Sequence, residues 1–167
     1  MPRQTNFSSG VYDQATIFWS WLFPLSYLIH IAEEYWGGEG YPAYILHLRG
    51  VHMSTARFLA AQSVGFILVT IGVILARRFK FLPMMLVILG TIVAVNGLTH
   101  IVTALSMLSY GPGLFSSILI WGPLGIATLI RFKAGIDDQR QYWIAIAIGV
   151  GVNVVVAILT MRGGRVV

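Results

Sequence analysis

Residues 83–108 read PMMLVILGTIVAVNGLTHIVTALSML and contain no Asp, Glu, Lys or Arg. An α-helix needs about 20 apolar residues to cross the hydrocarbon core of a bilayer, so this stretch is long enough to span a membrane. Four further stretches have the same apolar character, at residues 16–34, 55–76, 112–130 and 141–161. The apolar runs are continuous rather than alternating, which favours helices over a β-barrel. The sequence therefore predicts an all-α integral membrane bundle of five transmembrane helices.

The composition supports the same fold class. Of the 167 residues, 57% are hydrophobic and only 10% are charged, whereas a soluble domain has about 25% charged residues. The chain has no cysteine, which excludes a disulfide scaffold. It also lacks a basic run with interleaved aromatic residues, so nucleic acid is not an expected partner. We expect a single membrane domain over residues 1–167 and leave the oligomeric state open, with a homo-oligomer among the options.

The distribution of lysine and arginine predicts how the helices are oriented. One predicted side of the membrane carries seven of these residues: Arg3, Arg77, Arg78, Lys80, Arg131, Lys133 and Arg140. The other side carries four: Arg49, Arg57, Arg162 and Arg165. Because positively charged loops favour the cytoplasmic side, we expect a cytoplasmic N-terminus and an external C-terminus in a plasma or inner membrane.

All histidines and glutamates fall on the side with fewer positive charges. They are His30, Glu33, Glu34, Glu39, His47, His52 and His100. Within the first span, Glu33 and Glu34 follow His30 by three and four residues, so the three side chains share one helix face. Ionisable groups near lipid cost at least about 2.5–3.5 kcal/mol each and usually mark a functional site.

Two further pairs lie close to this group in the predicted topology. Asn96 and His100 are four residues apart in the third span, on one helix face and in the outer third of the bilayer. His47 and His52 lie in the segment YPAYILHLRGVHM, which has the character of an interfacial helix. They are five residues apart, so on a regular helix their side chains diverge by about 140°.

These residues resemble a known family. The segment HIAEE at residues 30–34 matches the motif after which the HXXEE family is named, and NGLTH at residues 96–100 is similar to the N-x-x-x-H motif that accompanies it. The size and the several apolar spans are also similar, so the resemblance covers most of the chain. It supports the choice of site residues and implies nothing about substrate or reaction.

The leading hypothesis is a metal site. The predicted ligands are His30, Glu33, Glu34, His47, His52 and His100. Imidazoles and carboxylates without cysteine suit iron, zinc or manganese, as one divalent ion or as two with a bridging carboxylate. The spacing of histidine and glutamate reverses the Glu-x-x-His of di-iron helix bundles. We therefore favour oxidation or desaturation over hydrolysis.

The predicted catalytic residues are Glu33, Glu34 and Asn96. A glutamate not used as a ligand would act as a general acid or base, and Asn96 would orient a ligand or contact the substrate. Because the site lies near the membrane interface, we expect a lipid or another hydrophobic small molecule as substrate. Two alternatives stay open. One is a metal-free acid–base isomerase, similar in architecture to sterol isomerases of the emopamil-binding-protein type. The other is a small proton or metal transporter.

Overall fold

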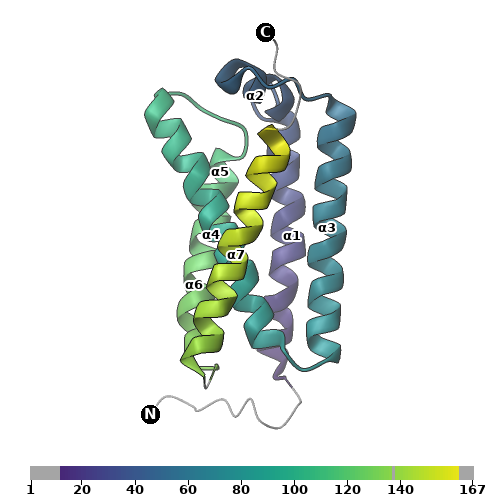
Figure 1. Cartoon of the computed structure of the whole chain (residues 1–167), viewed down its shortest axis with the longest axis vertical. Helices are drawn as coiled ribbons and strands as arrows, with labels where there is room; N and C mark the ends of the chain where they lie inside the picture. The colour runs from purple at the N-terminus through teal and green to yellow at the C-terminus, as the bar shows by residue number, and fades with distance from the viewer. Residues whose placement is uncertain (1–11, 137, 162–167) are drawn as a thin grey trace.

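The structure is a computed structural model that describes residues 12–136 and 138–161. Its long helices run up and down through one bundle (Figure 1). Five of them are long and apolar enough to cross a membrane: α1 (Gln14–Trp36), α3 (Thr55–Arg78), α4 (Leu82–Met107), the composite span Leu114–Lys133 and α7 (Gln139–Met161). The predicted all-α membrane fold is thus confirmed, and each predicted stretch coincides with one of these helices to within a few residues.

Local sequence signals explain where the helices begin. The carboxylate of Asp13 caps α1 by accepting a hydrogen bond from the Thr16 amide at 2.8 Å. The hydroxyl of Ser54 caps α3 in the same way, at 3.2 Å from the Arg57 amide. Pro83 lies in the first turn of α4, where its missing N–H removes no helical hydrogen bond.

The fourth span is not a uniform α-helix. It consists of α5 (Leu114–Ser116), a π-helical turn η2 (Ser117–Trp121) and α6 (Gly122–Lys133). In the π-turn, the Gly122 amide donates to the Ser117 carbonyl. Pro123 follows directly and has no N–H for the preceding turn, which explains why the wider turn occurs here. Such turns are frequent at functional sites.

Helix α4 forms the centre of the bundle and packs against α3, α6 and α7. Its Leu82, Leu86 and Val87 are fully buried. A Cβ added to Gly125 on α6 would lie 2.8 Å from the carbonyl oxygen of Gly90 on α4. Small residues therefore let the two backbones approach closely, as is common between membrane helices. The outer faces of α3 and α7 leave many large apolar side chains exposed, as expected of surfaces that meet lipid.

The two ends of the bundle differ in chemistry. At one end, the short helix α2 (Tyr41–Arg49) lies across the top of the bundle beside the end of α1 (Figure 1). It corresponds to the predicted interfacial helix, and we call this end, with residues 30–34 and 108–113, the motif end. The opposite end, which we call the basic end, carries Arg77, Arg78, Lys80, Arg131, Lys133 and Arg140. Three of the arginines counted above, Arg3, Arg162 and Arg165, lie outside the described residues. The orientation of the bundle in the membrane stays a prediction.

Candidate metal centre

Three polar side chains meet inside the motif end. His30 and Glu34 come from α1 and His100 comes from α4, and their potential ligand atoms all lie within 4.8 Å of one another. The Glu34 Oε1 atom is 3.7 Å from His30 Nε2 and 3.6 Å from His100 Nε2. His30 and Glu34 are almost fully buried, with 2% and 4% of their surface exposed. We call these three residues the His-Glu-His cluster.

The ring of His30 is held in place from two sides. Its Nδ1 atom lies 2.8 Å from the hydroxyl of Ser116. The same hydroxyl lies 3.3 Å from the Gly113 carbonyl oxygen, so it links the His30 ring to the loop before α5. The indole of Trp121 stacks on the same ring, with centroids 3.6 Å apart and planes inclined by 23°. These contacts fix the orientation of the ring, so that its Nε2 atom faces Glu34.

Glu34 is also hydrogen-bonded on the side away from the histidines. Its Oε2 atom accepts from the amide of Gln62 on α3. The Gln62 Oε1 atom in turn accepts from the hydroxyl of Tyr27 at 2.8 Å. Neither Gln62 nor Ser116 belongs to the motifs that predicted the site. An amide within an otherwise apolar span was the available signal for Gln62, because such groups need a partner inside the membrane.

Gly113 completes the wall of the cluster. Its φ of +90° is a left-handed conformation that side chains rarely adopt. A Cβ at this position would lie 2.8 Å from His100 Cε1 and 2.9 Å from His30 Cε1. The loop before α5 therefore shapes the cluster, and only glycine fits where this loop passes the two rings.

Glu33 lies outside the cluster and serves the fourth span instead. Its carboxylate accepts hydrogen bonds from the Phe115 amide at 2.8 Å, the Ser116 amide at 2.6 Å and the Tyr110 hydroxyl at 3.0 Å. Successive residues on a helix point about 100° apart, so Glu33 and Glu34 face different neighbours. Burial and the hydrogen bond to Glu33 raise the pKa of Tyr110 to about 12, so the Tyr110 hydroxyl keeps the proton that it donates.

The two histidines around α2 are also outside the cluster. His47 Nδ1 lies 2.7 Å from Glu39 Oε2, and 70% of the His47 side chain is exposed. His52 is exposed in the segment between α2 and α3. Of the six predicted ligands, the structure thus brings His30, Glu34 and His100 together and leaves Glu33, His47 and His52 elsewhere. For His47 the reason is that α2 lies across the end of the bundle rather than packing inside it.

Two buried polar atoms beside the cluster have no hydrogen-bond partner among the described residues. They are Asn96 Oδ1 and Trp121 Nε1. Asn96 lies one helical turn before His100 on α4, and the Trp121 ring stacks on His30. Buried polar groups without partners are rare in folded proteins and often mark a place where a water, an ion or a ligand binds.

Comparisons with known proteins agree with the motif at the centre of this site. A family model described as "Protein of unknown function with HXXEE motif" matches residues 21–128. The matched segment contains the cluster and the groups that hold it in place, Gln62, Gly113, Ser116 and Trp121. No curated protein and no solved structure matches the chain.

Proposed function

This chain belongs to the HXXEE family, and we propose that it is a membrane-embedded metalloenzyme that acts on a lipid-like substrate. The observation that carries the proposal is the meeting of His100 with His30 and Glu34, because these residues are far apart in the sequence and come from two helices. The two nitrogens and one carboxylate oxygen form a set that suits iron, zinc or manganese.

The separations within the cluster support metal binding over direct hydrogen bonding. The distances of 3.6 and 3.7 Å from Glu34 Oε1 to the two Nε2 atoms exceed the 3.2 Å that limits most hydrogen bonds to nitrogen. Ligands about 2.0–2.2 Å from a tetrahedral zinc ion lie roughly 3.4 Å apart. The two separations from Glu34 Oε1 are therefore close to the distance between ligands in a coordination shell and longer than a hydrogen bond.

Burial gives a second argument for a cation. Glu34 is 4% exposed and lies in a span that passes through lipid, where an unpaired carboxylate is costly. Among the described residues, the neutral amide of Gln62 is the only group that hydrogen-bonds this carboxylate. A divalent ion at Oε1 would offset the negative charge.

The number of ligands matches a catalytic site with one ion. Three protein ligands leave at least one coordination position for water or substrate, whereas structural zinc sites are closed by four. When bound, the ion would supply Lewis-acid or redox chemistry. We favour oxidation or desaturation over hydrolysis, because two imidazoles and one carboxylate with open positions are the ligand set of non-haem iron oxygenases. The two-ion alternative has less support, because Glu33, His47 and His52 are engaged or exposed elsewhere.

A lateral groove supports a lipid-like substrate. It has a volume of about 370 Å³ and lies between α1 and α3, lined by Leu28, Ile31, Leu59, Gln62, Ser63, Phe66 and Ile67. The walls are mostly apolar, as an acyl chain would require. Gln62 lines this groove and also hydrogen-bonds Glu34 of the cluster. The groove therefore runs from the lipid-facing surface to Gln62.

Individual residues then have distinct roles in the proposal. Glu34, His30 and His100 would hold the ion. Asn96, whose Oδ1 has no partner among the described residues, would bind a polar group of the substrate. Glu33 would position His30 indirectly, because its carboxylate holds the Ser116 amide while the Ser116 hydroxyl contacts His30.

The proposal is tested by elemental analysis of protein purified in detergent without chelators. We expect about one equivalent of a transition metal in the wild-type protein and in His52→Ala, and loss of the metal in His100→Ala. His52→Ala is the matched control, because it removes an exposed histidine at the same end of the bundle. Wild-type protein that folds but contains and binds no transition metal would contradict the proposal and favour the acid–base alternative.

A further inference from the structure

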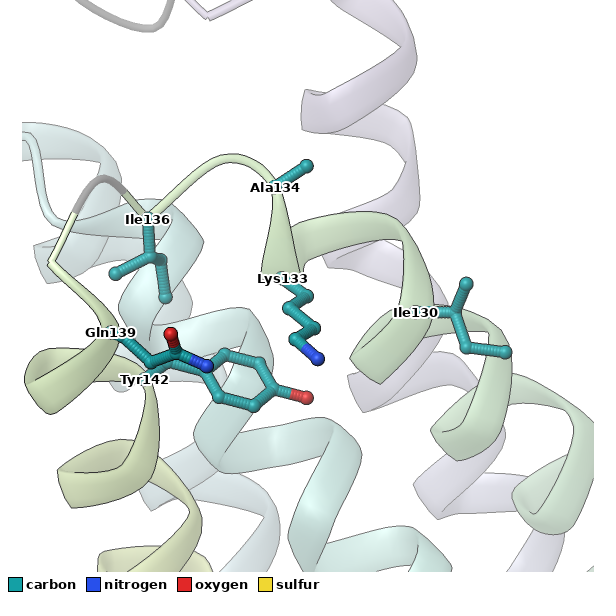
Figure 2. A pocket seen from close by; sticks show the side chains of 6 residues that line it. All are labelled: Ile130, Lys133, Ala134, Ile136, Gln139 and Tyr142. Carbon is teal, nitrogen blue, oxygen red and sulfur yellow. The ribbon is translucent and has the colours of Figure 1, made fainter.

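A second pocket lies at the basic end, far from the cluster. It has a volume of about 380 Å³ and is lined by Ile130, Lys133, Ala134, Ile136, Gln139 and Tyr142. The pocket is formed where α6 ends and α7 begins (Figure 2). All six residues follow residue 128, so none belongs to the segment that the family model matches. Nothing in the proposed enzyme function uses these residues.

The polar groups of the pocket are mainly donors. Lys133 is exposed, and its ammonium has no ion pair or hydrogen bond among the residues that the structure describes. In Figure 2 this ammonium and the Tyr142 hydroxyl point toward one another across the pocket, and the Gln139 amide lies beside the tyrosine ring. The Tyr142 hydroxyl donates to the Leu129 carbonyl at 3.3 Å. The ammonium and the amide N–H groups therefore remain available to an anion.

The surroundings favour a negatively charged ligand. Lys133 is the only charged residue of the lining, and Arg131 and Arg140 lie in the same helix ends. In the described part of the turn, Asp138 is outside the lining and caps α7 by accepting from the Arg140 amide at 2.8 Å. A cation that has no ion pair among the described residues, at the end of the bundle that carries most of the positive charge, is complementary to an anion.

The apolar part of the lining indicates that the anion carries hydrocarbon. Ile130 is 72% exposed on the lipid-facing surface of α6, and Ile136 forms the opposite wall (Figure 2). Trp143, beside Tyr142, is also exposed, as aromatic residues at a membrane interface commonly are. The pocket thus combines a cationic head with apolar walls at the end of a transmembrane helix.

We infer that this pocket binds the phosphate of an anionic phospholipid, with Lys133 and Gln139 as donors to its oxygens. Basic pockets between membrane helices are a known way to bind acidic lipid headgroups. The lipid phosphate fits between the ammonium and the amide, and its acyl chains leave along Ile130 and Ile136. This inference is independent of the metal site.

Native mass spectrometry of the full chain tests the inference. The protein is released from micelles that contain equal amounts of phosphatidylglycerol and phosphatidylcholine, and the lipids that remain bound are counted. We expect retention of phosphatidylglycerol in the wild-type protein and about a fivefold loss in Lys133→Gln, as for one basic contact to an anionic lipid. Gln139→Leu should weaken retention less. Lys80→Gln is the matched control, because it removes the only other lysine from the same end.

The outcomes separate the sources of the anion. Unchanged retention in Lys133→Gln, or equal loss in both lysine variants, would overturn the pocket as the binding site. Two further arms add millimolar inorganic phosphate or water-soluble glycerophosphoglycerol. If either displaces the lipid completely, the pocket binds a free anion and the lipid assignment is wrong. Little displacement by either compound supports a site that needs both phosphate and acyl chains.

Discussion

Two pairings of histidine with glutamate at the motif end differ in almost every physical respect. His47 and Glu39 are 2.7 Å apart, and their side chains are 70% and 38% exposed. His30 and Glu34 are 3.7 Å apart, and their side chains are 3% and 6% exposed. The exposed pair forms a direct contact of the kind that contributes little in water. The buried residues are held apart by neighbours, which shows that residue type alone does not define a site.

The largest effect should come from removing the charge at the centre of the buried cluster. In Glu34→Gln the amide can still bond Gln62, so we expect the fold to persist. Metal affinity should fall by on the order of 100-fold or more. Losing a hydrogen bond to a ligand already lowers metal affinity by about 10–100-fold, and losing the ligand itself should lower it further. Competition with a chromophoric chelator measures the affinity. Glu39→Gln is the control, and equal affinities in the two variants would place the metal elsewhere.

A smaller effect is expected when the group that orients His30 is removed. Ser116→Ala deletes the hydroxyl 2.8 Å from His30 Nδ1, and such losses typically reduce metal affinity by about 10–100-fold. Ser117→Ala is a matched control, since the Ser117 hydroxyl donates only to the Gly113 carbonyl, at 2.6 Å. The same chelator titration applies. A similar loss in both variants would indicate damage to the loop rather than to the orientation of His30.

Glu33→Gln should separate stability from metal binding. The carboxylate holds the start of the fourth span through two amides and Tyr110, and hydrogen bonds to a charged group contribute about 1.5–3 kcal/mol. We expect a lower free energy of unfolding in detergent, by roughly that amount, with metal stoichiometry retained. Loss of metal without loss of stability would instead make Glu33 a ligand.

The Tyr110 contact in this network also predicts a pH dependence. Because the pKa of Tyr110 is raised to about 12, its stabilising effect is complete below the ordinary tyrosine pKa of about 10 and is lost as the pH rises through 12. Comparing the unfolding of wild type and Tyr110→Phe between pH 8 and 12 checks this. A constant difference across that range would contradict it.

The smallest effect is expected at the exposed pair. His47→Ala removes a surface contact, so the free energy of unfolding should change by less than about 1 kcal/mol, and metal content should stay the same. Thermal unfolding and elemental analysis on one preparation measure both quantities. A His47 variant without metal would show that α2 closes over the cluster in the working protein and that the exposed pair is part of the site.

Much of this architecture is readable from the sequence. Continuous apolar runs such as residues 83–108 must be helical in lipid, because each backbone group has to find its partner within the segment. The pairing of His30 with Glu34 follows from their four-residue spacing on a helix. Local rules of this kind need no knowledge of the neighbouring helices.

Side-chain contacts between different helices could not be predicted from the sequence. Nothing in the spacing distinguishes Glu33 from Glu34, and their roles separate only because the start of the fourth span lies against one and α3 against the other. The contributions of Gln62 and Ser116 depend on helix rotation, which apolar sequence in lipid leaves undefined. His47 and His52 match the required chemistry, but His47 lies on α2 outside the core and His52 lies in the segment between α2 and α3.

The sequence by itself determined the membrane fold, the positions of the spans and the helix face shared by His30 and Glu34, because these depend on hydrophobicity and helical period. Only the tertiary structure decided that His100 joins them, that Glu33 leaves them and that Lys133 borders a pocket. Those outcomes depend on how helices rotate and pack against one another, and the close contacts of Gly90 with Gly125 and of Gly113 with the histidine rings fix that packing.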